Sequence, residues 1–182
     1  MSHPRIVIRD AVKIILSAHL PKVDARVTPA RIHLMKMTPL FAGKLPAVLI
    51  YSKQESIDDR PGEHQGNRYR KLTLAIEVVA SGESAANEAD VIAWAIEQHL
   101  EADETLAHLV EAIRLTNTDV EFDSDGDTPV MAVRLNFEVR YWTRQESDDA
   151  LIPQQVLTSW SPNIGTPNEP KYKLLGDDDG WY

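Results

Sequence analysis

The chain has 182 residues, of which 43% are hydrophobic and 26% charged, a balance typical of a folded globular protein rather than a disordered one. It contains no cysteine, which excludes disulfide bonds, thiolate metal sites and cysteine nucleophiles. The formal net charge of −9 argues against stable binding to nucleic acid, because such binding depends on clustered Lys and Arg.

The first predicted element is a helix over residues 4–20. Ser2 is placed to cap its start and Pro21 to end it. Apolar residues recur at helical spacing, at Ile8, Ala11/Val12, Ile15 and Ala18. The opposite side has a cationic stripe of Arg5, Arg9 and Lys13, for which a solvated or subunit-facing role is favoured over membrane binding.

The middle of the chain predicts a strand, a loop and a second strand. Residues 45–51 are apolar, with Pro46 near their start, and predict the first strand. Residues 54–67 are polar and contain Pro-Gly, so we expect an exposed loop, either functional or disordered. Residues 68–80 alternate between apolar and polar positions, which is the period of a half-buried strand.

A second helix and a hairpin are predicted next. Residues 84–102 are rich in Ala and place an apolar stripe on one helical face. Residues 112–122 and 130–142 then flank an Asp-Gly turn, which is a strong hairpin signal.

These elements predict an α+β fold for residues 1–144. We expect a four- or five-stranded sheet, largely antiparallel or mixed, with two main helices packed on one face. Residues 145–182 lack periodicity, are acidic and contain four prolines, so they are expected to form an extended or disordered tail. Aromatic residues in this tail could dock on a partner.

Opposite charges are segregated along the chain. Residues 1–54 have nine Lys or Arg and two Asp or Glu, whereas residues 55–144 have eight Lys or Arg and nineteen Asp or Glu. Two explanations of this distribution are equally good. The charged residues can belong to ordinary solvated faces, or they can form surfaces that attract other copies of the chain.

No motif predicts catalysis or a cofactor. Asp123, Asp125 and Asp127 have oxygen ligands suited to calcium, but the spacing of Gly126 and Arg134 departs from that of an EF-hand. A plain acidic turn is therefore the favoured interpretation, and no metal site is predicted. The six histidines lack metal-ligand spacing, and neither a phosphate-binding loop nor a nucleophile elbow is present.

With its elements in this order, the chain resembles the tail terminator family of long-tailed bacteriophages, which includes the minor tail protein U of phage lambda. The resemblance covers roughly residues 4–143 and leaves out the polar loop and the tail. The residues that support it are Ile8-Arg9-Asp10-Ala11-Val12, Leu45-Pro46-Ala47-Val48-Leu49-Ile50-Tyr51, Arg70-Lys71-Leu72-Thr73-Leu74-Ala75-Ile76-Glu77, Ala89-Asp90-Val91-Ile92-Ala93-Trp94-Ala95-Ile96-Glu97 and Val133-Arg134-Leu135-Asn136-Phe137-Glu138-Val139-Arg140-Tyr141.

The resemblance implies a non-enzymatic virion protein. It would form a ring, expected to be a hexamer, on the completed tail tube, stop tube polymerisation and offer a surface to the head-completion protein. Its place would be the phage tail, and the host cytoplasm during assembly. The alternatives are another head–tail connector or tail-completion protein, a small cytoplasmic enzyme, and a nucleic-acid-binding module that uses the basic N-terminal third.

Two groups of residues are candidates for this role. In the first hypothesis, Arg5, Arg9 and Lys13 of one subunit face the acidic Asp123, Asp125 and Asp127 of the next. In the second, the loop residues Asp58, Asp59, Arg60 and His64 contact the tail tube.

Overall fold

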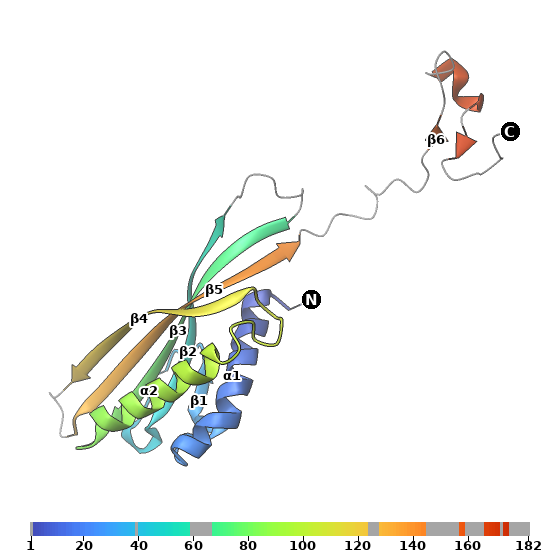
Figure 1. The fold of residues 1–182 in the computed structure, drawn as a ribbon. Helices are drawn as coiled ribbons and strands as arrows, with labels where there is room; N and C mark the ends of the chain where they lie inside the picture. Colours follow the sequence, from blue (N-terminus) through green and yellow to red (C-terminus); the bar gives the residue numbers. More distant parts are fainter. Residues whose placement is uncertain are drawn as a thin grey trace. The chain divides into compact units, whose positions relative to one another are not determined.

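The structure is a computed structural model that describes residues 2–38, 40–58, 67–123, 128–144, 157–158, 166–171 and 173–174. The chain divides into two units, residues 1–144 and 145–182. In the first unit, two helices lie against one face of a five-stranded sheet (Figure 1). The predicted α+β class is confirmed.

The sheet has the strand order β1-β2-β3-β5-β4. Its strands are β1 (Ile32–Leu34), β2 (Ala47–Asp58), β3 (Asn67–Ser81), β4 (Ala112–Asp123) and β5 (Val130–Arg144). β1 is parallel to β2, and the other neighbouring pairs are antiparallel, so the sheet is mixed. The sequence analysis missed β1, because three residues are too few to show a period.

Helix α1 (Pro4–Val23) differs from its prediction at both ends. His3, not Ser2, is the N-cap, because Pro4 takes the first helical position and the His3 side chain accepts a hydrogen bond from the Arg5 backbone N–H. Pro21 lies inside the helix, which continues to Val23 and closes with the Asp24 N–H bonded to the Leu20 carbonyl.

The buried side of α1 is also narrower than predicted. The fully buried residues recur every fourth position and are Ile8, Val12, Leu16 and Leu20. Ala11 and Ile15 are only partly buried, and Ala18 is exposed.

Helix α2 (Ala85–Glu101) lies beside α1 and packs over β3 and β5. The alternating apolar residues predicted for these two strands form the floor of the core. All of them are buried: Leu72, Leu74, Ile76 and Val78 of β3, and Val133, Leu135, Phe137, Val139 and Tyr141 of β5. One continuous core therefore joins both helices to the central strands.

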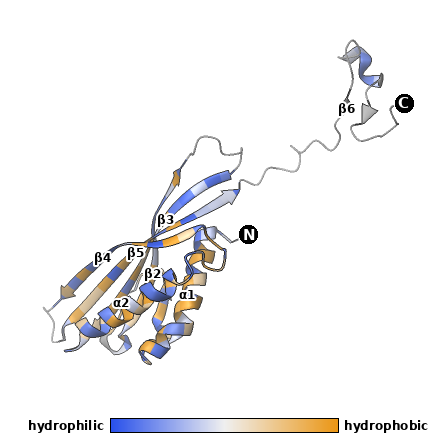
Figure 2. Ribbon diagram, in the orientation of Figure 1, coloured by the Kyte–Doolittle hydropathy of each residue, from blue (hydrophilic) through white to orange (hydrophobic). Residues whose placement is uncertain are grey.

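β2 and β3 extend into the segment predicted to be a loop. Residues 54–58 belong to β2 and pair with residues 69–73 of β3, while Asn67 pairs with Arg144 of β5. The prediction of a loop over 54–67 is therefore wrong at both ends. The extension is possible with polar residues because most side chains of residues 53–57 are exposed, and β3 is coloured largely hydrophilic at this end (Figure 2). Tyr69 and Leu72 of β3 are nevertheless buried.

The predicted hairpin is confirmed as the antiparallel pair β4 and β5. Its turn, residues 124–127, lies outside the described residues. In the second unit, β6 (Leu157–Thr158) pairs with β7 (Lys173–Leu174), and the short helix η4 (Thr166–Lys171) precedes β7. These short elements have no periodic signal in the sequence.

Candidate interaction surfaces

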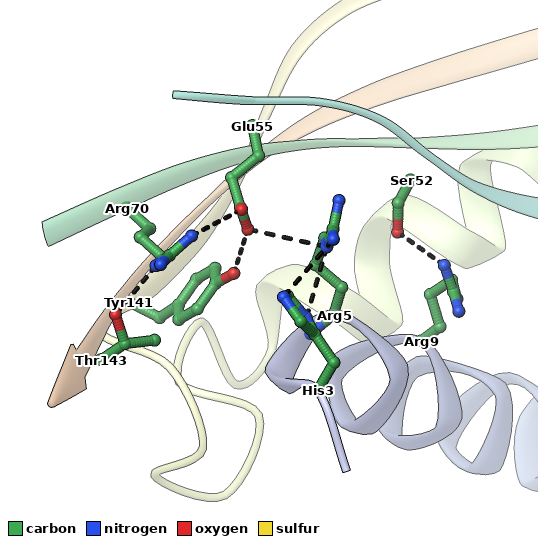
Figure 3. Close-up of polar contacts among 8 residues, drawn as sticks. All are labelled: His3, Arg5, Arg9, Ser52, Glu55, Arg70, Tyr141 and Thr143. Atoms are coloured by element: carbon green, nitrogen blue, oxygen red, sulfur yellow. Dashed lines mark hydrogen bonds and ion pairs between the residues drawn. The ribbon is translucent and has the colours of Figure 1, made fainter. Parts of the chain in front are cut away.

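A partly buried carboxylate, Glu55, organises a polar cluster between β2, β3, β5 and the start of α1 (Figure 3). Its side chain is 12% exposed. Arg70 Nη1 lies 2.7 Å from Glu55 Oε2, and the Tyr141 hydroxyl donates to Oε1. Arg70 Nε also donates to Thr143 Oγ1 at 2.8 Å. Burial and the hydrogen bond to Glu55 raise the pKa of Tyr141, so this hydroxyl keeps its proton and acts as a donor.

The first two cations of the predicted stripe face this cluster. Arg5 Nε lies 4.0 Å from Glu55 Oε1, and Arg9 Nη1 donates to Ser52 Oγ at 3.1 Å (Figure 3). Arg9 Nε is buried and has no hydrogen-bond partner among the described residues. Lys13, the third cation, is half-buried. Its charge contributes, after burial and Lys36, to a lowered pKa of His33.

The predicted partners of the stripe are only partly within the described residues. Asp123 ends β4 and pairs with Val130, whereas Asp125 and Asp127 lie outside the described residues. The structure does not bring Asp123 together with Arg5, Arg9 or Lys13 within one chain, and a contact between subunits stays a prediction.

The loop proposed to contact the tube is represented by one described residue. Asp58 ends β2, and its Oδ2 lies 3.1 Å from Lys71 Nζ. Asp59, Arg60 and His64 lie outside the described residues.

The sheet face opposite the helices has a polar network centred on Arg134 of β5. Its Nη2 lies 3.0 Å from Glu77 Oε2 on β3, and its Nη1 lies 3.4 Å from Glu121 Oε1 on β4. The hydrogen bond that Arg134 donates to Glu77, together with the negative charges of Glu77, Glu121 and Asp119, raises the pKa of Arg134. The network gives this face cross-strand support in place of an apolar cover.

At the β1 end of the sheet, a basic edge segment, residues 35–38 and 40–45, folds against β2. The Met35 N–H donates to the Ile50 carbonyl at 2.9 Å, and the Tyr51 hydroxyl donates to the Lys36 carbonyl at 3.2 Å. Two grooves of about 470 and 530 Å³ adjoin here, since Lys36, Thr38 and Leu40 line both. Met37 and Phe41 are 96% and 74% exposed.

At the other end of the sheet, β4 is an edge strand with exposed apolar side chains. Val120 pairs with Val133 and Phe122 with Met131, so both side chains are on the helix side of the sheet. They are nevertheless 57% and 62% exposed. Glu121, between them, is directed to the opposite face, where it meets Arg134.

Sequence reasoning missed these exposed apolar residues at both sheet edges. The basic edge segment has no period from which burial could be predicted. In β4 a register shift between Leu115 and Asn117 interrupts the alternation, so the sequence could not show that Val120 and Phe122 lie on the helix side or that they remain uncovered.

A third hollow of about 460 Å³ lies between the helices. It is lined by side chains of both helices and the turn after α2: Ala11, Ile14, Ile15, His19, His99, Ala102, Asp103, Leu106 and Ala107. The rings of His19 and His99 stack with their centroids 4.1 Å apart. Burial, followed by the charges of His19 and Lys22, lowers the pKa of His99.

Within the described residues, no group of three or more His, Asp or Glu side chains is arranged to hold a metal ion. None of the helices in those parts of the chain is both long and apolar enough to cross a membrane.

Comparisons with known proteins assign no family. No protein-family model matches the chain, and no curated protein matches it in sequence. One solved structure similar to it is a chain of the virion of a native gene transfer agent particle, with 13% sequence identity and a TM-score of 0.49. The match covers 74% of this chain and 94% of that one.

Proposed function

We propose that this chain is a structural protein of a phage-type virion, a tail terminator that forms a ring on the completed tail tube. The observation that supports this most is the pair of exposed sheet edges: one is basic, the other is acidic, and each has uncovered apolar side chains. Exposed apolar residues grouped with charges are typical of protein interaction sites. A closed ring requires two such unlike surfaces on each subunit.

The order of the elements supports the terminator role within this class. The two helices and the closing hairpin occur in the order that the resemblance to tail terminators implies, β3 includes its second strand motif, and β2 includes residues 47–51 of its first. In this proposal the ring stops addition of tube subunits and presents its far side to the head. No chemical step is required of any residue.

Deletion of the gene from the phage or prophage genome that encodes it tests the proposal. We expect particles with overlong or unstable tails, and normal tails when the gene is supplied in trans. Finished tails of normal length beside heads that leak would instead favour a head-side connector. Normal, infectious particles would contradict both roles.

The cationic stripe and the polar loop remain proposals within this function. If Lys13 faces an acidic residue of the next subunit, Lys13→Glu should weaken the ring and reduce its sensitivity to salt. Unchanged mass by light scattering across a salt series would contradict that pairing. For residues 58–64, slower hydrogen exchange in the presence of tail tubes is expected, and equally fast exchange would contradict tube contact.

A further inference from the structure

We propose that the β4 edge of one copy docks on the basic edge segment of a second copy, with Val120 and Phe122 seated against its grooves. The inference rests on the proposed ring and identifies the two surfaces that would join its subunits. It differs from the pairing of the α1 cations with the acidic turn, because it uses the two ends of the sheet.

The first argument is charge. The sequence has no Asp or Glu between residues 25 and 54, and no Lys or Arg between residues 115 and 133. The first range includes the basic edge segment with Lys36 and Lys44, and the second includes residues 115–123 of β4 with Asp119, Glu121 and Asp123. Unlike charges on two surfaces of one chain favour contact between copies over contact of either surface with itself.

The second argument is apolar shape. The basic edge segment offers two adjoining grooves with Leu40 in both, and β4 offers two large apolar side chains that no helix covers. Phe122 is large enough to fill such a groove, and burial of an aromatic ring is a common anchor of protein interfaces. Lys44, which is exposed beside Phe41, would then lie near the acidic side chains that alternate with Val120 and Phe122.

The third argument is position. β1 and β4 are the two ends of the strand order, so the basic edge segment and the exposed side chains of β4 lie at opposite edges of the sheet. The groove of about 470 Å³ also extends from the basic edge segment over the sheet to Val79 and Val130. One copy can therefore hold a neighbour at each edge. Such head-to-tail contacts generate a ring when the rotation between copies closes. β4 pairs with a strand on one side only, so this contact would also protect its outer edge from non-specific pairing.

Thiol crosslinking between full-length chains tests the contact directly, because the protein has no cysteine of its own. Thr38→Cys and Thr118→Cys place single thiols at exposed positions, one beside the grooves and one on β4. A short bifunctional thiol reagent should give a covalent dimer when the two variants are mixed and none with either variant alone. Crosslinking of Thr118→Cys to itself would overturn the proposal in favour of a symmetric pairing of two β4 edges.

Two sets of substitutions measure the contributions of the apolar and charged groups by sedimentation or light scattering. Phe122→Ser should weaken self-association about tenfold or more, while Trp94→Ser, an equally exposed control on α2, should leave it unchanged. Lys44→Glu and Glu121→Lys should each weaken association, and mixing the two variants should restore contact between unlike copies. Lys22→Glu is the control for reversal of an exposed charge.

The outcomes separate this inference from the proposed function. If the chain forms rings that Phe122→Ser and the charge reversals leave intact, the β4 contact is wrong and the ring proposal stands. If the wild-type chain associates neither with itself nor on tail tubes, both are overturned.

Discussion

The Tyr141 hydroxyl donates a hydrogen bond to the Glu55 carboxylate, and this contact joins β5 to β2 across the intervening strand β3. Arg70 of β3 completes the link from the same carboxylate (Figure 3). The cluster therefore links three strands where the core residue Tyr141 meets the polar part of β2.

Tyr141→Phe should lower the free energy of unfolding by about 1.5–3 kcal/mol, the range for a hydrogen bond to a charged group. Tyr51→Phe is the matched control, because its hydroxyl donates to the neutral carbonyl of Lys36. That change should lower the free energy by only about 0.5–1.5 kcal/mol. Urea denaturation measures the free energy of unfolding of both variants. Equal losses would show that the hydrogen bond to the charged Glu55 stabilises the fold no more than the one to the neutral carbonyl.

The paired histidines predict a dependence of stability on pH. Because the folded state lowers the pKa of His99 below its usual 6.5, the unfolded chain takes up a proton first as the pH falls. The free energy of unfolding should therefore decrease as the pH drops below about 6.5 and level off once the folded-state pKa has been passed. His33, whose pKa is also lowered, adds to the effect in the same direction.

His99→Gln should reduce this pH dependence, since it removes one of the two histidines whose pKa is lowered in the described part of the chain. Gln98→Asn, one position away on the same helix, removes no titratable group and should leave the dependence as in the wild type. Denaturation curves on both sides of pH 6.5 provide the measurement. An unaltered slope in His99→Gln would contradict the assignment.

Backbone strain in the turn after α2 gives the next prediction. Leu106, Ala107 and His108 have φ angles of 49°, 57° and 66°, a left-handed conformation that side chains disfavour. The Asp103 carboxylate holds the turn by accepting hydrogen bonds from the Thr105 hydroxyl and the Ala107 N–H.

Ala107→Gly should stabilise the protein by about 0.5–1 kcal/mol, because relief of the left-handed strain exceeds the added entropy of the unfolded chain. Ala18→Gly, on an exposed helical position of α1, should have the opposite sign and cost about 0.5–1 kcal/mol. Thermal unfolding of the two variants distinguishes them, and the same sign for both would contradict this account.

Much of the fold could be predicted because it follows from periodicity. The alternation in residues 68–80 and 130–142 correctly identified the central strands and their buried face, since a strand buried on one side must alternate. The same reasoning failed for residues 54–58, because most of their side chains are exposed and show no apolar alternation. β1 was too short for any pattern.

The candidate surfaces were less predictable for a related reason. The spacing of Arg5 and Arg9 predicted that they share one side of α1, opposite the apolar stripe. They do lie together, but the predicted side was wrong, because both are half-buried and lie against Ser52 and Glu55 of β2. Exposure of Phe41 and Phe122 depends on which elements fail to cover them. Such information exists only in the tertiary arrangement.

Packing of the core predicts a large difference between two aromatic residues. Phe137 of β5 is fully buried beneath the helices, whereas Trp94 of α2 is 61% exposed. Phe137→Ala should lower the free energy of unfolding by about 3–5 kcal/mol through lost burial and a residual cavity. Trp94→Ala should change it by no more than about 0.5 kcal/mol. Comparable losses in urea denaturation would mean that α2 covers a different face of the sheet.

Arg9 provides a test that separates stability from assembly. Its Nε atom is buried without a hydrogen-bond partner among the described residues, which is unfavourable, while its aliphatic stem packs at the boundary of α1 and β2. Arg9→Met keeps most of the stem and removes the unsatisfied donor. The free energy of unfolding should therefore stay the same or rise by up to about 1 kcal/mol, despite the lost bond to Ser52.

If Arg9 also faces an acidic residue of a neighbouring subunit, the same variant will fold normally and associate more weakly. Equal association of the variant and the wild type would restrict Arg9 to its place within the chain.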